Sequence, residues 1–265
     1  MHRTRAKSLT LSRATPKIRS RSPIENGAQA GTIAHMLKLE RIKAISLDLD
    51  DTLWPIWPTI ERAEKMLHEW LLINAPSTAA KYASPRALRE IRDAVGQQRP
   101  DLAHDMTALR RESIRLALSS AGDDPQLAGP AFDIFIAERH NVTFFPDALP
   151  ALEFLAARYP LVSLSNGNAE LSRLGLASFF AASVAALKVG VSKPDPRIFQ
   201  VAAGAVGVQP HEVLHVGDDA ILDVLGARDA GMQAAWLNRE HAPWPHAEKP
   251  HLELADLSEL VNALG

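Results

Sequence analysis

The sequence predicts an α/β fold in which a parallel sheet is interrupted, after its first strand, by an α-helical insertion. Three observations lead to this prediction. Short apolar segments that end in polar residues recur along the second half of the chain, separated by amphipathic helical segments. Residues 55–145, in contrast, show helical periodicity throughout. Finally, 265 residues with 46% hydrophobic side chains are enough to fill a sizeable core.

The first expected element is a strand over residues 43–49, which is apolar and ends in a run of acids. Helices are expected next over residues 59–73, 85–95, 103–121 and 127–141. In the third helix, Arg110, Arg111 and Arg115 alternate with apolar side chains, as in an amphipathic surface helix. We therefore predict a core domain of residues 36–54 and 146–265, with residues 55–145 inserted as a helical domain.

After Pro146 the pattern changes to alternating helices and strands. Helices are expected over residues 147–159, 195–206 and 221–230, and again at the end of the chain to about residue 264. Strands are expected over residues 161–165, 183–187, 213–216, 233–237 and 252–254. Strands that are joined by single helices lie parallel and connect through right-handed crossovers.

The composition excludes several classes of protein. The chain has no cysteine, which rules out disulfides, thiolate zinc sites, iron–sulfur clusters and cysteine nucleophiles. The longest weakly charged apolar stretch, residues 174–187, is shorter than the about 20 residues that a membrane-spanning helix needs. We therefore expect a cytoplasmic protein that does not enter a membrane.

The first 35 residues differ from the rest of the chain. They carry a net charge of +6, whereas the remaining residues carry −8. They are rich in Arg, Ser, Thr, Gly and Pro and show no periodicity, so we predict a disordered basic tail. The alternatives are an organelle transit peptide, a nucleic-acid-binding arm, or translation that begins at Met36. No apolar segment of a secretory signal is present.

Polar side chains gather where the predicted strands end. Asp48, Asp50 and Asp51 follow the first strand. The other strand ends are followed by Ser165 and Asn166, by Lys193, and by Asp218, Asp219 and Asp223. The carboxyl ends of parallel strands meet at one edge of the sheet, which is where ligands bind in open α/β sheets. The sequence therefore predicts one site that contains acids, a hydroxyl and a lysine.

The spacing of the acids favours a divalent cation. Asp48 and Asp50 are two residues apart, so at the end of a strand both can point to the same side. Two carboxylates that lie so near to each other both remain ionised only if a cation joins them. Asp218 and Asp223 add further negative charge. Mg²⁺ prefers oxygen ligands and is the usual ion where phosphate is the partner. Lys193 and a hydroxyl at the same edge suit phosphate oxygens.

These residues lie in stretches that resemble the haloacid dehalogenase (HAD) superfamily. The stretches are LDLDDTLW at 47–54, LVSLSNGN at 161–168, SKPDPRIF at 192–199 and HVGDDAILDVLGARDAGM at 215–232. They occur in the family's order, and the resemblance covers residues 40–262. It implies a three-layer, Rossmann-like parallel sheet. It also implies that residues 55–145 form a C1 cap, a helical lid that closes over the site and excludes water.

The resemblance also implies roles for the matching residues. Asp48 is expected to be the nucleophile that accepts the phosphoryl group. Asp50 is expected to protonate the leaving alkoxide and then to activate water. Mg²⁺ is expected on the Asp48 carboxylate, the Asp50 main-chain carbonyl, Asp218 and Asp223.

The phosphoryl group is expected to be bound by Ser165, Asn166 and Lys193. Two further acids have simpler interpretations. We expect Asp51 to anchor its loop, and for Asp219 a helix cap and a metal contact are equally acceptable.

Several stretches outside these motifs resemble one subgroup, the bacterial YigB-like phosphatases. They are HDMTALRRESI at 104–114, LSNGNAELSRLGLASFF at 164–180, EVLHVGDD at 212–219, GMQAAWLN at 231–238 and PHLELADL at 250–257. The resemblance implies flavin mononucleotide (FMN) or 5-amino-6-(5-phospho-D-ribitylamino)uracil as substrate. Trp54, Trp57 and Arg110 are candidate cap contacts, although Trp in the cap core and Arg on a solvated face are the simpler interpretations.

Other functions remain open at this point. A phosphatase or phosphomutase of a different sugar or organic phosphate fits the same motifs. A phosphoryl-accepting regulatory domain also combines acids, a hydroxyl and a lysine, but such domains are shorter and have no cap. A true dehalogenase would not need the acid at position 50. We expect a small phosphate ester as partner, and neither nucleic acid nor membrane.

Overall fold

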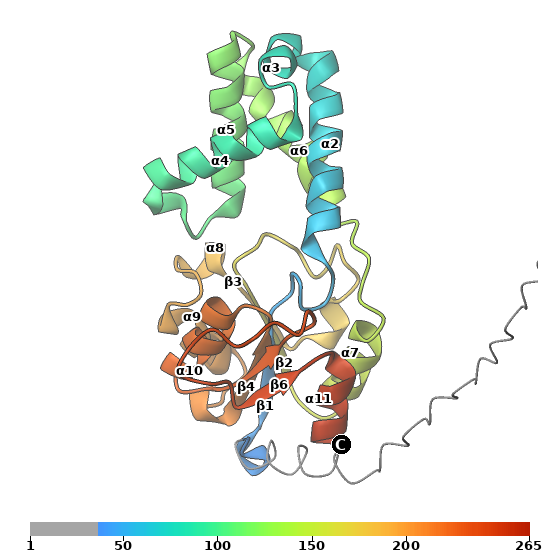
Figure 1. The fold of residues 1–265 in the computed structure, drawn as a ribbon, viewed down its shortest axis with the longest axis vertical. Helices are drawn as coiled ribbons and strands as arrows, with labels where there is room; N and C mark the ends of the chain where they lie inside the picture. The colour runs from blue at the N-terminus through green and yellow to red at the C-terminus, as the bar shows by residue number, and fades with distance from the viewer. Residues whose placement is uncertain (1–36) are drawn as a thin grey trace, which may run out of the picture.

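The central element of the fold is a sheet of six parallel strands. The computed structural model describes residues 37–265, so the predictions for residues 1–35 lie outside it. The strand order is β3-β2-β1-β4-β5-β6. The strands are β1 (Ala44–Leu47), β2 (Leu161–Ser165), β3 (Ala182–Ala185), β4 (Val213–Gly217), β5 (Gln233–Leu237) and β6 (Leu252–Leu254). Figure 1 shows this sheet with helices on both of its faces.

Strand β1 lies at the centre of the sheet, between β2 and β4. All four of its residues are buried because both faces of a parallel sheet are covered. Ile45 and Leu47 belong to the apolar layer beneath helices α7 (Ala148–Ala156) and α11 (Leu257–Leu264). Ala44 packs in the opposite layer, beneath α9 (Pro196–Ala205) and α10 (Gly226–Asp229). The predicted three-layer α/β fold is therefore confirmed.

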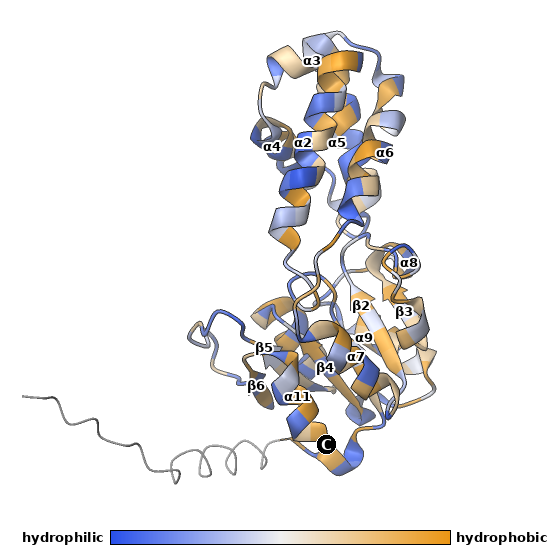
Figure 2. Ribbon diagram, turned by 90° about the vertical axis from the view of Figure 1, so that its right-hand side faces the viewer, coloured by the Kyte–Doolittle hydropathy of each residue, from blue (hydrophilic) through white to orange (hydrophobic). Residues whose placement is uncertain are grey.

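Residues 56–139, which follow β1, form a helical bundle beyond the carboxyl edge of the sheet, as Figures 1 and 2 show from two directions. Its helices are α2 (Ile56–Asn74), α3 (Pro76–Lys81), α4 (Pro85–Gln98), α5 (Met106–Ala121) and α6 (Ala128–Arg139). The bundle has an apolar core of its own, which includes Leu67, Leu118 and Phe135. The domain limits at residues 54/55 and 145/146 remain predictions.

Some elements differ from the expectation. Helix α3 and the short helix α8 (Ala186–Val189) were not expected. Helix α5 begins at Met106 rather than at residue 103 because the Asp105 side chain accepts a hydrogen bond from the Ala108 N–H and caps the helix. The helix expected over residues 221–230 consists of a π-helical segment (Ala220–Leu225) followed by α10. Among the helices of residues 37–265, none is long and apolar enough to span a membrane.

Candidate active site

The carboxyl edge of the sheet brings together three of the residues that the sequence singled out. Lys193 lies between two acids, with Nζ 2.5 Å from Oδ1 of Asp48 and 2.6 Å from Oδ1 of Asp223. All three side chains are buried. Asp48 directly follows β1, and Asp223 lies in the π-helical segment after β4. Because β1 and β4 are neighbours in the sheet, the two carboxylates that follow them lie close enough to share the Lys193 ammonium.

Lys193 is held in place by Asn166. The main-chain N–H of Lys193 donates to Oδ1 of Asn166 at 2.7 Å, and the amide Nδ2 donates back to the Lys193 carbonyl at 3.0 Å. This pairing engages both polar atoms of the Asn166 side chain. We expected Asn166 to contact phosphate, and that contact stays a prediction. In the structure, its side chain orients the lysine.

Ser165 and Gly167 form the turn that follows β2. Oγ of Ser165 accepts a hydrogen bond from the Gly167 N–H at 2.9 Å, which leaves the hydroxyl hydrogen for another acceptor. A Cβ atom at position 167 would lie 2.8 Å from Oδ2 of Asp50 and 3.3 Å from Oγ of Ser165. Only glycine therefore allows the turn to approach Asp50 this closely.

Three acids lie close enough to hold a metal ion together. Asp48, Asp218 and Asp223 each offer a carboxylate oxygen within 4.8 Å of the others. Burial raises the pKa of Asp48 to about 7 despite the nearby lysine, and burial with Asp48 and Asp223 raises that of Asp218 to about 8. The single positive charge of Lys193 is thus too little to keep all three acids ionised at neutral pH. An oxygen-only donor set of this kind fits a hard divalent cation such as Mg²⁺.

Asp223 differs from the other two acids. Burial alone would raise its pKa, but Lys193 and His215 outweigh burial and hold the pKa well below its ordinary value. Nε2 of His215 lies 3.1 Å from Oδ1 of Asp223, and its Nδ1 lies 2.7 Å from Oγ of Ser46. Because an ionised carboxylate only accepts hydrogen bonds, the imidazole donates from Nε2 and accepts from the Ser46 hydroxyl. His215 was not among the predicted site residues, although a histidine inside an apolar strand is a usable signal.

Asp50 points to partners outside the acidic cluster. Nη2 of Arg139 lies 2.6 Å and 2.8 Å from the two carboxylate oxygens of Asp50. Nε1 of Trp54 donates to Oδ1 at 2.9 Å. Arg139 is the last residue of α6 and was not among the predicted site residues, because no local pattern in the sequence distinguishes it.

Asp51 and Asp219 shape the chain beside the site. Asp51 has a positive φ of 55°, and its Oδ1 accepts the Ile56 N–H at 2.9 Å where α2 begins. Oδ1 of Asp219 accepts the N–H groups of Ile221 and Leu222, both at 2.8 Å. Asp51 therefore anchors its loop, as expected, and Asp219 caps the segment that carries Asp223.

The candidate cap contacts have different environments. Trp54 is buried, whereas Trp57 is 53% exposed. The guanidinium of Arg89 lies over the Trp57 ring, 4.8 Å from its centre. Arg110 is buried with its guanidinium 3.7 Å from the ring centre of Phe135. Burial, with a smaller contribution from Arg92, lowers the pKa of Arg110 to about 9.

Two cavities border the site. One of about 370 Å³ lies beside Asp218 and is lined in part by Trp57, Phe145 and Trp236. Another of about 400 Å³ lies between Thr107 of the helical bundle and residues 167–172 of the core.

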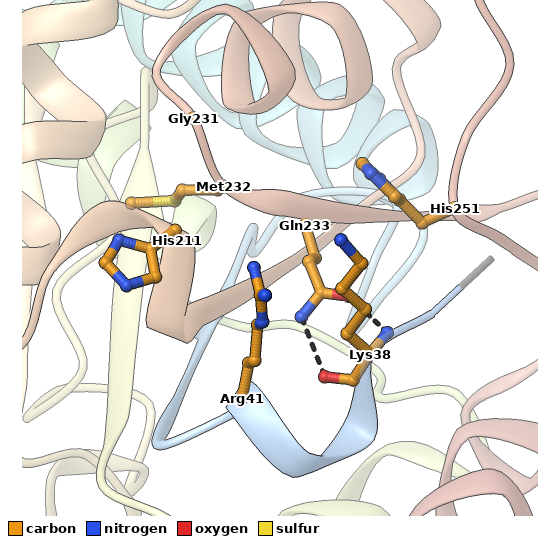
Figure 3. Close-up of a pocket in the computed structure, with 7 residues that line it drawn as sticks. All are labelled: Lys38, Arg41, His211, Gly231, Met232, Gln233 and His251. Carbon is orange, nitrogen blue, oxygen red and sulfur yellow. Dashed lines mark hydrogen bonds between the residues drawn. The ribbon is translucent and has the colours of Figure 1, made fainter.

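A third cavity, of about 390 Å³, lies at the opposite edge of the sheet, before β1, β4, β5 and β6 (Figure 3). It is lined by Lys38, Arg41, His211, Gly231, Met232, Gln233 and His251. The clustered acids lie at the carboxyl edge, so this third cavity is separate from the site.

The fold and the clustered acids define a three-layer α/β protein with an acidic site at the carboxyl edge of its sheet and a helical bundle beyond that edge. The chain belongs to the haloacid dehalogenase-like hydrolases, whose family profile matches residues 42–231. The resemblance that the motifs indicated is thereby confirmed.

Relatives of known activity match nearly all of the described chain. The 5-amino-6-(5-phospho-D-ribitylamino)uracil phosphatase YigB of Escherichia coli K12 is 34% identical over 85% of this chain and 98% of its own length. A glyceraldehyde 3-phosphate phosphatase of Methanopyrus kandleri is 30% identical over 84% of this chain and 97% of its own. The protein is thus an enzyme of the HAD-like hydrolase family, and it has phosphatases among its relatives.

A solved structure is also similar. The 2-haloacid dehalogenase of Pseudomonas syringae pv. tomato DC3000 is 39% identical, with a TM-score of 0.77 over 84% of this chain and 98% of that one. Proteins similar to this chain thus include dehalogenases as well as phosphatases.

Proposed function

We propose that this enzyme is a Mg²⁺-dependent phosphomonoester hydrolase that works through an aspartyl phosphate. The observation that carries the proposal is the separation of the first two acids. Asp48 lies in the buried cluster beside Lys193, whereas Asp50 is bound by Arg139 and Trp54. Two carboxyl groups with different environments suit two different chemical roles.

In the first half-reaction, a carboxylate oxygen of Asp48 attacks phosphorus and the bond from phosphorus to the ester oxygen breaks. Asp50 gives its proton to the departing alkoxide. Lys193 and the Ser165 hydroxyl donate to the phosphoryl oxygens and balance their charge in the transition state.

In the second half-reaction, Asp50 takes a proton from water. The oxygen of that water attacks phosphorus, and the bond from phosphorus to Asp48 breaks. Inorganic phosphate leaves and both carboxyl groups return to their starting states.

Mg²⁺ would be held by the carboxylates of Asp48, Asp218 and Asp223 and by the main-chain carbonyl of Asp50. When bound, it neutralises charge between the nucleophile and the phosphoryl oxygens. Gly217 supports this arrangement, because a Cβ there would lie 2.3 Å from Cγ of Asp223 and would force that acid out of the cluster.

The proposed substrate is a small metabolite phosphate, with FMN and 5-amino-6-(5-phospho-D-ribitylamino)uracil first. The support is the similarity to YigB along cap and core together. The cavity beside Asp218 adds to it, because Trp57 and Phe145 offer apolar surface to a planar ring, and its volume falls in the range of ligand sites.

Dehalogenation is the competing activity, because the similar Pseudomonas syringae protein is described as a dehalogenase. Halide leaves as an anion that needs no proton, so that reaction has no use for the acid at position 50. The contacts that hold Asp50 favour the phosphatase.

A panel of substrates tests the proposal. We expect the highest kcat/KM for FMN or the ribitylaminouracil phosphate, and no release of halide from 2-chloropropionate. A clear preference for glyceraldehyde 3-phosphate or a hexose phosphate would overturn the substrate assignment. Halide release without phosphatase activity would overturn the reaction class.

A further inference from the structure

Both connections between the helical bundle and the sheet converge on Asp50. The first connection contains Trp54, whose indole N–H donates to Oδ1 of Asp50. The second begins after Arg139, whose Nη2 contacts both carboxylate oxygens at 2.6 Å and 2.8 Å. Asp50 and Arg139 are 89 residues apart in the chain, so only the folded cap brings them together.

Arg139 has a fixed place in the structure, since its side chain is only 2% exposed. The next residue, His140, has Nδ1 2.7 Å from the Ile136 carbonyl, and its Nε2 accepts the Glu170 N–H at 2.9 Å. This second bond fastens the end of α6 to the loop that follows β2. The position of Arg139 therefore depends on how the cap is seated on the core.

The arginine is not placed there for stability alone. Its Nη1 atom is buried and has no hydrogen-bond partner among residues 37–265. An unpaired donor on a buried charged group costs free energy. Such a cost is tolerated most readily at functional sites, where the remaining contacts serve the chemistry.

We propose that Arg139 is a positioning residue that orients the Asp50 carboxyl group toward the leaving group. This inference rests on the proposed function. Arginine and tryptophan can only donate hydrogen bonds, so together they fix the rotation of the carboxyl group that accepts from them. Without Arg139, the Asp50 side chain keeps one fixed partner, Trp54, and can turn away from the ester oxygen. Because Arg139 belongs to the cap, the acid is set for reaction when the cap is seated.

This role predicts a dependence on the leaving group. The alkoxide of an alkyl phosphate must be protonated as it departs, whereas p-nitrophenolate is stable enough to leave without a proton. Loss of an oriented acid should therefore slow alkyl esters far more than p-nitrophenyl phosphate. A purely structural role would slow both alike.

The experiment compares kcat and KM of Arg139→Met and Arg139→Lys with FMN and with p-nitrophenyl phosphate. For Arg139→Met we expect kcat with FMN to fall about 30-fold, kcat with p-nitrophenyl phosphate to fall less than about 3-fold, and both KM values to stay within about 3-fold. Arg139→Lys should recover part of the loss, because the ammonium can still reach one oxygen. If FMN is not turned over, glycerol phosphate replaces it as the alkyl ester.

Arg62→Ala is the matched control. Arg62 donates to the Asn141 carbonyl at 2.5 Å and pairs with Glu138, so it supports the same connection without touching Asp50. We expect its ratio of FMN to p-nitrophenyl phosphate turnover to equal that of the wild type. An equal shift in Arg62→Ala would mean that a loosened connection, and not the orientation of Asp50, causes the effect.

A double-mutant cycle links the effect to Asp50. In an Asp50→Asn background, Arg139→Met should change the ratio no further. If the ratio falls again in that background, or if single Arg139 variants slow both esters equally, the inference is wrong. Failure of this inference can be told apart from failure of the proposed function. If the proposed function is wrong, the wild-type enzyme hydrolyses neither ester. Should Arg139→Met fail to fold, Arg139→Lys and Arg139→Gln give the same comparison.

Discussion

Lys193 and Asp223 form a buried ion pair, with Nζ 2.6 Å from Oδ1 and neither side chain more than 3% exposed. Burial alone would lower the pKa of the lysine, but Asp223 and Asp48 outweigh it and raise the pKa. The lysine thus keeps its positive charge beside Asp48. Among residues 37–265, Asp218 forms no ion pair of its own.

Replacing this lysine should damage both stability and activity. Lys193→Met leaves Asp48 and Asp223 buried without their partner, which costs about 3–5 kcal/mol of unfolding free energy. Hydrolysis of p-nitrophenyl phosphate should fall at least about 1,000-fold because the phosphoryl group loses its charged donor. Denaturant unfolding and steady-state kinetics measure the two effects. Lys188→Met, at an exposed lysine of α8, is the control and should behave as the wild type.

The raised pKa values predict how stability depends on pH without metal. Burial raises the pKa of Asp48 to about 7 and that of Asp218 to about 8, so between about pH 4 and pH 8 the folded state holds protons that the unfolded state has lost. The free energy of unfolding therefore falls as the pH rises through this window. In EDTA, Asp218→Asn should therefore lose less Tm between pH 5 and pH 8 than the wild type, because the variant lacks one of the two titrating carboxyl groups.

Mg²⁺ should reverse this trend, because it binds the ionised carboxylates of the folded state. We expect the increase in Tm on adding Mg²⁺ to be larger at pH 8 than at pH 5. The increase should shrink in Asp218→Asn. A Tm that does not respond to Mg²⁺ at either pH would contradict the proposed metal site.

Glycine at position 167 is predicted to be needed for full turnover. In Gly167→Ala the new Cβ would lie 2.8 Å from Oδ2 of Asp50, so either the acid or the turn must move. We expect kcat to fall about 10- to 100-fold, since a misplacement of about 1 Å can have an effect of this size. Gly129→Ala is the control, because nothing lies within 4 Å of a Cβ there. Equal activity of both variants would show that the close approach does not matter.

Asn166 offers a test of how Lys193 is positioned. Asn166→Ala removes two hydrogen bonds to the main chain of Lys193 and should lower kcat about 10-fold, while Mg²⁺ affinity stays unchanged. Kinetics with p-nitrophenyl phosphate at several Mg²⁺ concentrations separate these effects. If KM for the ester rises and kcat is unchanged, Asn166 binds phosphate instead, as the sequence suggested.

Much of the core could be predicted because its signals are local. Strands β2, β5 and β6 begin and end where expected, since each is a short apolar run between turn residues. The acids and the lysine were found because polar residues follow these runs at one edge of the sheet. The π-helical segment could not be predicted. There the Asp219 carbonyl accepts from both Asp223 and Val224, and helical periodicity does not distinguish these two spacings.

The rest of the site depends on contacts between distant parts of the chain. Arg139 looks in the sequence like one more charge at the end of a solvated helix, and only the folded chain brings it to Asp50. His215 lies in β4, and its partner Ser46 is 169 residues away. For the same reason, local patterns could not show that the Asn166 side chain pairs with Lys193.

The proposed mechanism requires that Asp48 carry the phosphoryl group during turnover. The most direct measurement is a quench of Asp50→Asn after mixing with substrate and Mg²⁺, followed by mass spectrometry of the peptides. Because this variant cannot activate water efficiently, we expect a phosphoryl group on the peptide that contains Asp48, and none in Asp48→Asn. A phosphoryl group on another residue, or full turnover by Asp48→Asn, would show that Asp48 is not the nucleophile.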